Sequence, residues 1–290
     1  MPDILRAILL MVVGSFLFML ADLFMKLSTQ TMSLGLVTMM LGGGMALFFV
    51  GLMLRSNTPF FDRRYLHFAM VMRCTGEVIG ISGVITALAY SPLATVTALM
   101  QSLPLLLTVM GAVFLKERVG WRRIVALCVG MIGVLIIIRP GMAGFDFYAT
   151  LTLVGVAGMA IRDFGTRIMP KEISTAALSF YGSVTIVLAG VGMVVVTGDW
   201  RGPVWTGMGH IFWLVVVGSL GTLAVSTAMR LGDVSVISPF RYVRVVFGVG
   251  AGVLVFGESV DVAVIVGSSI VVGAGLYSWT RERKLALAQA

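Results

Sequence analysis

The chain has 290 residues, of which 59% are hydrophobic and only 12% are charged, and its formal net charge is +8. A soluble domain carries about 25% charged residues, so this composition excludes an ordinary soluble protein and indicates one that lies in a bilayer. The basic residues lie between apolar segments, so their expected partner is an anionic lipid surface and not nucleic acid.

Ten segments are apolar and long enough to cross a bilayer as α-helices, which takes about 20 residues each. Their length and continuity disfavour the ten-residue alternation of a β-barrel. The first segment has no convincing cleavage site after its apolar run, so we expect a retained helix and not a signal peptide. In chain order the predicted helices are 4–25, 34–54, 65–88, 93–115, 121–138, 147–168, 174–196, 210–229, 234–256 and 260–279.

The chain repeats itself at an offset close to half its length. Glu117 and Glu258 each follow an apolar segment, and we call the separation between these two positions the repeat offset. We therefore predict two copies of one five-helix unit, residues 1–143 and 144–290. Because each unit has an odd number of helices, the second enters the membrane from the opposite side. The predicted fold is an all-α integral membrane protein with two inverted repeats around a central cavity.

The placement of lysine and arginine predicts the orientation in the membrane, because such residues gather on the cytoplasmic side. One set of loops and helix ends is strongly basic, and the alternate set is not. We therefore expect both termini in the cytoplasm and a multi-pass protein of the inner membrane. The expected cytoplasmic side includes Arg55, Arg63, Arg64, Lys116, Arg118, Arg122, Arg123, Arg162, Arg167, Lys171 and Arg230.

Charges inside the apolar segments of the first half are informative, because each costs upward of about 2.5 kcal/mol at mid-bilayer. Arg73 and Glu77 lie one helical turn apart, so they are predicted to pair, either as a coupling site or as a structural ion pair. Asp22 lies one turn before Lys26, which predicts an ion pair near the outer surface. If Asp22 is instead desolvated, it could carry a proton.

Two later segments carry candidate groups for a cavity wall. Gln101 lies near Pro104, whose ring removes a backbone hydrogen bond and can kink the helix. Arg241 and Arg244 lie three residues apart without an acid on their segment, which suits an anionic or zwitterionic ligand; alternatively, they reach the cytoplasmic interface. The predicted substrate-binding residues are Tyr90, Gln101, Trp213, Ser238, Arg241, Tyr242 and Arg244, and the predicted hinges are Pro104 and Pro239. Packing against lipid or core is the alternative for each aromatic residue.

Several chemistries find no support in the sequence. It contains no GxxxxGK[ST] loop, so we expect no ATP site. His67 and His210 are isolated, so we expect no metal site and no cofactor. The two cysteines lie in apolar segments, which favours packed thiols over a disulfide. A membrane enzyme would need clustered acids, metal ligands or a nucleophile, so we predict that the protein is not an enzyme.

Three stretches carry a family resemblance: ALAYSPLATVTAL at 87–99, FLKERV at 114–119 and FGESV at 256–260. With the ten-helix pattern, they resemble EamA-type members of the drug/metabolite transporter superfamily. The resemblance implies a basket of the first, third, fourth, sixth, eighth and ninth helices around a central cavity. It also implies transport by alternating access, commonly export of amino acids or related metabolites.

We therefore predict a secondary transporter that exports amino acids or similar small metabolites. The alternative within transport is uptake of a larger flat or anionic metabolite, such as a vitamin or a nucleotide-like compound. A non-transporting scaffold is the alternative from another class. The expected partners are a small-molecule substrate and the bilayer, while the sequence leaves the oligomeric state open, a monomer included.

Overall fold

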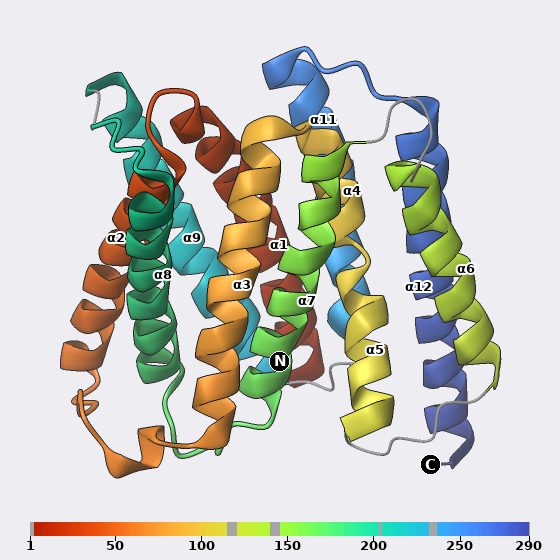
Figure 1. The fold of residues 1–290 in the computed structure, drawn as a ribbon. Helices are drawn as coiled ribbons and strands as arrows, with labels where there is room; N and C mark the ends of the chain where they lie inside the picture. The colour runs from red at the N-terminus through yellow and green to blue at the C-terminus, as the bar shows by residue number, and fades with distance from the viewer. Residues whose placement is uncertain (1–2, 115–120, 140–145, 203–204, 232–236, 290) are drawn as a thin grey trace.

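The computed structural model describes residues 3–114, 121–139, 146–202, 205–231 and 237–289, and every regular element in them is helical (Figure 1). The expected unit boundary between residues 143 and 144 lies outside this part of the chain. The elements are α1 (Asp3–Thr29), α2 (Leu34–Arg55), the 3₁₀ turn η1 (Arg63–Tyr65), α3 (Phe68–Tyr90), α4 (Leu93–Met100), α5 (Leu103–Phe114), α6 (Trp121–Ile138), α7 (Phe147–Arg167), α8 (Thr175–Thr197), α9 (Trp205–Leu231), the 3₁₀ turn η2 (Ser238–Tyr242), α11 (Val243–Phe256) and α12 (Val262–Gln289).

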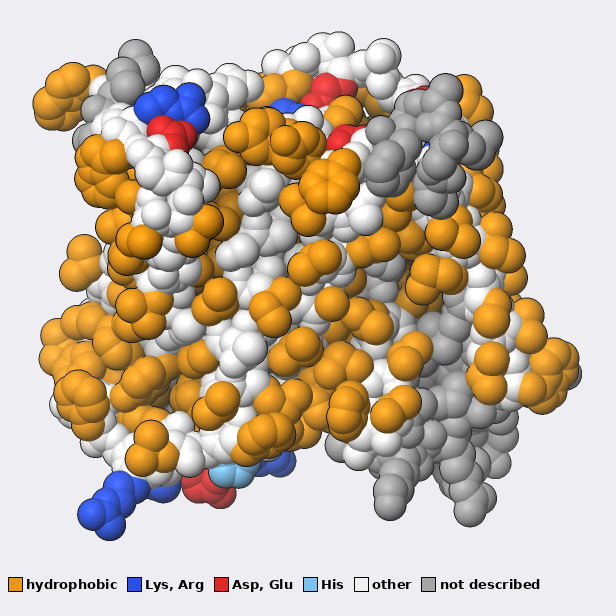
Figure 2. Space-filling view, in the orientation of Figure 1, with side chains coloured by type: hydrophobic (Ala, Val, Ile, Leu, Met, Phe, Trp, Pro, Cys, Tyr) orange, Lys and Arg blue, Asp and Glu red, His pale blue; other side chains and the backbone are white. Residues whose placement is uncertain are grey.

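The predicted helical membrane fold is confirmed. Among the described residues, seven helical stretches are long and apolar enough to cross a bilayer, and two shorter apolar helices accompany them. Figure 2 shows hydrophobic side chains over the height of one face, with charged side chains at its upper and lower rims. Such a belt matches the apolar interior of a bilayer and its two polar surfaces.

The expected single helix at 93–115 is interrupted between Met100 and Leu103. Pro104 has no N–H, and its ring would clash with the carbonyl of residue 100, so regular helical hydrogen bonding is disrupted at this point. The N–H groups of Gln101 and Ser102 instead bond to carbonyls three residues back, at 3.1 and 3.0 Å. The interruption therefore precedes the proline by one turn and places Gln101 at the end of α4.

The expected helix at 234–256 is also interrupted. Its described part begins with η2, which carries Pro239 in its first turn, and continues as α11. Tyr242 ends η2, and the repeat offset carries Gln101 onto Tyr242. The two interruptions thus fall at equivalent places of the repeated sequence.

The helices pack in pairs across the two halves of the chain. The most extensive pairs are α3 with α7, α1 with α9, α2 with α8, α6 with α12 and α4 with α11. The repeat predicts a correspondence between the halves, in the order α1 to α7, α2 to α8, α3 to α9, α4/α5 to η2/α11 and α6 to α12. If the halves are exchanged in this way, the pair α3–α7 becomes α1–α9, and each of the other pairs becomes itself. Moreover, α7 begins at the end of the bundle where α1 finishes, as an inverted arrangement requires (Figure 1).

Glycines let α3 and α7 approach closely. A Cβ on Gly83 would lie 2.6 Å from the backbone nitrogen of Gly155, and one on Gly158 would lie 2.3 Å from that of Gly80. Small residues allow such contact between membrane helices. The close approach brings the polar residues near the end of α7 against α3.

The two ends of the bundle differ in charge. We call the end with Arg55, Arg63 and Arg64 the basic end; it contains η1 and the connection from α7 to α8. The opposite end contains the turns that join α3 to α4 and α11 to α12. The turn from α3 to α4 is as short as expected, because α3 ends at Tyr90 and α4 begins at Leu93.

Candidate substrate site

Two small cavities lie inside the bundle, with volumes of about 80 and 20 Å³. Residues of α1, α2, α3, α4, α7, α8, α9 and α11 line the larger one, and its charged members are Asp22, Glu77, Arg162 and Arg244. The smaller one reaches Gln101, Pro104 and Arg241. The cavities adjoin, because they share the residues Phe18, Met100, Met159, Arg162 and Arg244.

The first charged contact of the site joins a residue of the first half of the sequence to one of the second half. Asp22 on α1 and Arg244 on α11 are 4% and 8% exposed. Nε of Arg244 donates to Oδ2 of Asp22 at 3.0 Å, and Nη2 donates to the same oxygen. The Arg244 guanidinium also lies 5.6 Å from the ring centre of Phe18. A cation with a carboxylate and an aromatic face is stabilised in an apolar interior.

The second contact is a chain of four charges from η2, α7 and α3. Nη1 of Arg241 donates to Oδ2 of Asp163 at 2.7 Å. Nε of Arg162 donates to the other oxygen of Asp163 at 3.0 Å, and its Nη1 lies 3.3 Å from Oε1 of Glu77. Removing one partner of such a buried pair costs about 3–5 kcal/mol, because the remaining charge stays desolvated.

The expected local ion pairs are wrong. Arg73 does not pair with Glu77; its Nη1 donates to Oγ1 of Thr166 at 2.5 Å and its Nε to the carbonyl of Leu178 at 3.2 Å. Asp22 does not pair with Lys26, because it accepts from Arg244. Groups one turn apart can meet on a helix, but a buried charge gains more from partners on neighbouring helices that surround it.

Arg241 is a buried cation with unused hydrogen-bond donors. It is 8% exposed, and its Nε and Nη2 have no hydrogen-bond partner among the described residues. The smaller cavity lies against it, together with Gln101, which is 2% exposed. Unsatisfied buried donors are costly, so this position favours a ligand with acceptor oxygens.

The described charges inside the bundle have an excess of one positive charge. The four cations and three carboxylates are Arg73, Arg162, Arg241, Arg244, Asp22, Glu77 and Asp163. A net positive interior attracts an anion or the carboxylate of a zwitterion.

The other predicted site residues lie elsewhere. Tyr90 is 58% exposed and lies at the opposite end, with its ring 4.5 Å from that of Tyr148. Trp213 is 51% exposed on α9. Tyr242 is buried, and its side chain lies against Gly275 of α12. It therefore packs against α12 and does not line either cavity. The backbones of Ser238 and Pro239 lie in η2, while their side chains are outside the described part of the structure.

Sequence reasoning missed Arg162 and Asp163, and placed Arg162 with the cytoplasmic residues. The structure buries both within α7, with 13% and 5% of their side chains exposed. A signal was present, because the repeat offset carries Asp22 onto Asp163 and both follow long apolar runs. The offset therefore predicts a second interior carboxylate once Asp22 is taken as the first.

A polar cluster closes the opposite end. Nζ of Lys26 donates to Glu258 at 2.9 Å and to the carbonyl of Ser91 at 2.7 Å. The Glu258 carboxylate also accepts from the backbone N–H groups of Leu93 and Ala94, at 2.8 and 3.1 Å. A carboxylate satisfies the free N–H groups and the dipole at a helix N-terminus. This cluster, the Glu258 latch, joins α1, the start of α4 and the end of α11.

Comparison with known proteins finds similarity to transporters. Residues 5–139 match the model of the EamA-like transporter family. The chain is 25% identical over 228 residues to an S-adenosylmethionine uptake transporter of Rickettsia bellii, covering 79% of this chain and 77% of that protein. It is 28% identical over 193 residues to a riboflavin transporter of Vibrio cholerae, covering 64% and 63% of the two chains. It is 28% identical over 196 residues to the pseudopaline exporter CntI of Pseudomonas aeruginosa, covering 65% and 66%.

A solved crystal structure shares the fold of this chain, with a TM-score of 0.62 and 17% sequence identity, over 96% of this chain and 98% of the other. The described residues thus combine a helical membrane fold with a charged interior cavity. Residues 5–139 are similar to the EamA-like transporter family, and the relatives reported above are named as transporters.

Proposed function

We propose that the protein is a secondary transporter for small metabolites that carry an α-amino-acid group, with Arg241 binding the carboxylate. The free Nε and Nη2 of Arg241 carry the proposal, because they are buried beside a cavity and have no partner among the described residues. A carboxylate accepts two parallel hydrogen bonds from a guanidinium, which matches these two donors.

The larger cavity supplies a place for the ammonium group. Both hydrogen bonds from Arg244 to Asp22 go to Oδ2, which leaves Oδ1 of Asp22 available beside the cavity. Glu77 lines the same cavity. A zwitterion with its carboxylate at Arg241 and its ammonium group near Asp22 would bridge the two charged contacts.

Transport would proceed by alternating access. The cavities, about 80 and 20 Å³, are far below the 300–1,000 Å³ of typical ligand sites, so this conformation is closed. We take residues 1–143 and 144–290 as inverted repeats whose exchange of conformations opens each end in turn. The basic end would face the cytoplasm with both termini, and the protein would lie in the inner membrane.

Transport in proteoliposomes tests the proposal. Radiolabelled amino acids are supplied on either side, with and without a pH gradient, and the first expected direction is export. We expect Arg241→Gln to lower transport at least tenfold, chiefly through a higher KM, and Arg241→Lys to recover part of it. Arg201→Gln is the control, because Arg201 is 60% exposed and pairs only with Asp199 among the described residues. Failure to move any amino-acid compound, or full activity of Arg241→Gln, would refute the proposal.

Uptake of a larger flat metabolite is the second candidate, and the names of the relatives favour it. The S-adenosylmethionine uptake transporter reported above aligns with 79% of this chain, and another relative is a riboflavin transporter. S-adenosylmethionine has an amino-acid group that could use Arg241, whereas riboflavin has no carboxylate. Inhibition of S-adenosylmethionine uptake by free amino acids would indicate a shared head-group site; riboflavin uptake that survives Arg241→Gln would indicate another site.

A further inference from the structure

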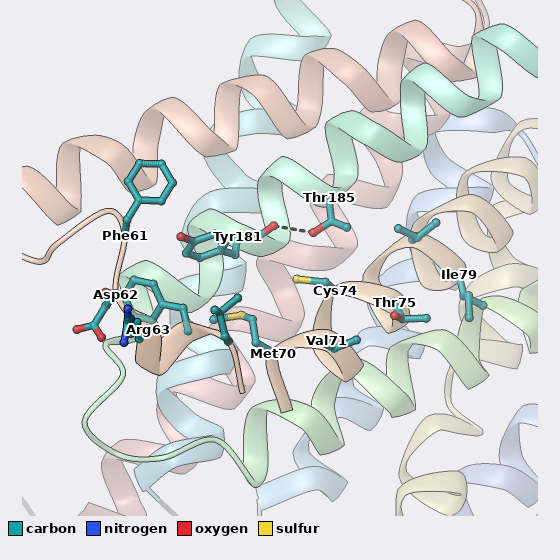
Figure 3. A pocket seen from close by; sticks show the side chains of 13 residues that line it. Phe61, Asp62, Arg63, Met70, Val71, Cys74, Thr75, Ile79, Tyr181 and Thr185 are labelled. Carbon is teal, nitrogen blue, oxygen red and sulfur yellow. Dashed lines mark hydrogen bonds between the residues drawn. The ribbon is translucent and has the colours of Figure 1, made fainter. Parts of the chain in front are cut away.

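A much larger hollow than the two interior cavities lies on the outside of the bundle, near the basic end. It has a volume of about 770 Å³ and lies between α3, α8 and the loop that contains η1 (Figure 3). It shares no lining residue with either interior cavity. We call it the α3–α8 groove.

The floor of the groove is an apolar stripe on α3. Met70, Val71, Cys74, Val78 and Ile79 follow one another on the same helical face, over roughly 13 Å at 1.5 Å per residue. On the α8 side, Oγ1 of Thr185 is bonded to its own helix at 2.6 Å, so it presents no free donor to the groove. Thr75 adds one hydroxyl group to the α3 side, but the lining is mainly apolar, so the interior suits a hydrocarbon chain better than a polar solute.

The end wall of the groove is firmly built. The hydroxyl of Tyr65 donates to the carbonyl of Pro59 at 2.8 Å, and that of Tyr181 donates to the carbonyl of Phe60 at 2.8 Å. The rings of Tyr65 and Tyr181 meet edge to face, with centroids 5.4 Å apart. These contacts fix the loop of residues 56–67 over the end of α3 and α8, so the groove is a shaped site.

A free cation lies at the mouth. Both Asp62 and Arg63 line the groove there (Figure 3). Arg64 occupies the Asp62 carboxylate, with hydrogen bonds of 2.9 and 2.6 Å from its guanidinium. Arg63 is exposed, and its side chain makes no hydrogen bond or ion pair among the described residues. The mouth thus offers one uncompensated positive charge.

The same loop has the character of a membrane interface. Phe61 and Leu66 are 89% and 88% exposed beside Arg63. Apolar side chains next to a cation favour the boundary between lipid tails and head groups. The groove thus begins at head-group level and runs along α3 into the apolar belt.

We propose that the α3–α8 groove binds one anionic phospholipid, with an acyl chain along α3 and the phosphate on Arg63. The apolar floor, the single free cation at the mouth and the depth of the groove each match one part of this molecule. A basic surface gains about 1 kcal/mol per basic residue near an anionic leaflet, which supports this occupant over a zwitterionic lipid.

Cys74 provides the test, because it is half-buried and lines the floor of the groove. With Cys128→Ser it becomes the only cysteine of the chain. The full-length protein is placed in nanodiscs of phosphatidylcholine alone or with one third phosphatidylglycerol, and the rate of N-ethylmaleimide labelling is measured. We expect labelling at least fivefold slower with phosphatidylglycerol, while soluble glycerol 3-phosphate added to phosphatidylcholine discs should give no protection.

Variants separate the head group from the chain. Arg63→Gln should abolish the difference between the two bilayers, whereas Arg201→Gln, at the opposite end, should preserve it. Native mass spectrometry should show one retained phosphatidylglycerol on the wild type and none on Val71→Trp, which fills the groove. Equal labelling in both bilayers, protection that survives Arg63→Gln, or retention unchanged by Val71→Trp would overturn the proposal. These readouts need no transport activity, so they stand apart from the proposed substrate.

Discussion

Among the glycines of α3, Gly76 is the one whose added Cβ would come closest to α7. A Cβ there would lie 2.4 Å from the backbone nitrogen of Arg162 and 2.6 Å from the carbonyl oxygen of Gly158. Both are backbone atoms, so no side chain can rotate away, and Gly76→Ala must push the helices apart. Such overpacking costs about 1–3 kcal/mol. Alanine recovers about 0.5–1 kcal/mol of helix propensity, so we expect a net loss of about 1–2 kcal/mol.

Gly43→Ala is the matched control, because a Cβ on Gly43 meets nothing within 4 Å. It carries only the gain in helix propensity, so it should leave stability unchanged or raise it slightly. Unfolding of both variants in mixed detergent with increasing dodecyl sulfate gives the two free energies. Equal stability of the two variants would show that the α3–α7 contact tolerates a methyl group, and the reasoning from Gly76 would fail.

Two further substitutions test the charged contacts. Asp22→Asn leaves Arg244 buried without its charged partner and should lower the free energy of unfolding by about 3–5 kcal/mol. The double variant Asp22→Leu with Arg244→Met should recover most of that loss. If thermal unfolding of purified Asp22→Asn gives a free energy within about 1 kcal/mol of wild type, the expectation is contradicted. Glu258→Gln removes the ion pair with Lys26 and weakens the cap on α4, so it should open the opposite end more often. In a variant with both native cysteines replaced and Ser15→Cys added at the smaller cavity, an impermeant thiol reagent should then react several-fold faster from that end; an unchanged rate would remove the latch from the mechanism.

Much of the fold could be predicted from the sequence, because long apolar runs leave a helix as the structure that satisfies its own backbone in lipid. The interruption of the fourth segment could be predicted only in part. Pro104 indicates a disturbed helix, but whether the chain kinks or separates depends on packing. The structure ends α4 at Met100 and seats Pro104 in the first turn of α5, where a missing N–H costs nothing.

The site was harder to predict, because its partners are far apart in sequence. Spacing of one turn pointed to Asp22 with Lys26, yet Arg244, the partner of Asp22, lies 222 residues away. In an apolar interior, a buried charge is stabilised by partners on the helices around it, and only the packing of helices decides which groups meet. Asp22, Arg73, Glu77, Arg241 and Arg244 could therefore be identified as interior candidates from the sequence, but their partners could not.

The repeat offset connects the latch with the interior charges. It carries Asp22 onto Asp163 and Lys26 onto Arg167, each at the corresponding place of α1 and α7. It also relates Glu258 to Glu117, which lies outside the described residues. The residues of the latch thus have basic and acidic counterparts in the other half of the sequence. Two latches in inverted units would close opposite ends, which is the symmetry that alternating access requires.

The arginines break this symmetry, and that difference bears on the substrate. At the positions equivalent to Arg241 and Arg244, the first half has Met100 and Leu103. If the halves exchange conformations, α4 and α5 take the place of η2 and α11, but the side chains of Met100 and Leu103 cannot donate to Asp22 or Asp163. The arginines must then keep these partners through the motion or replace them. A substrate carboxylate can take the place of Asp163 as the partner of Arg241. The conformational exchange should therefore be faster with such a substrate bound than without it.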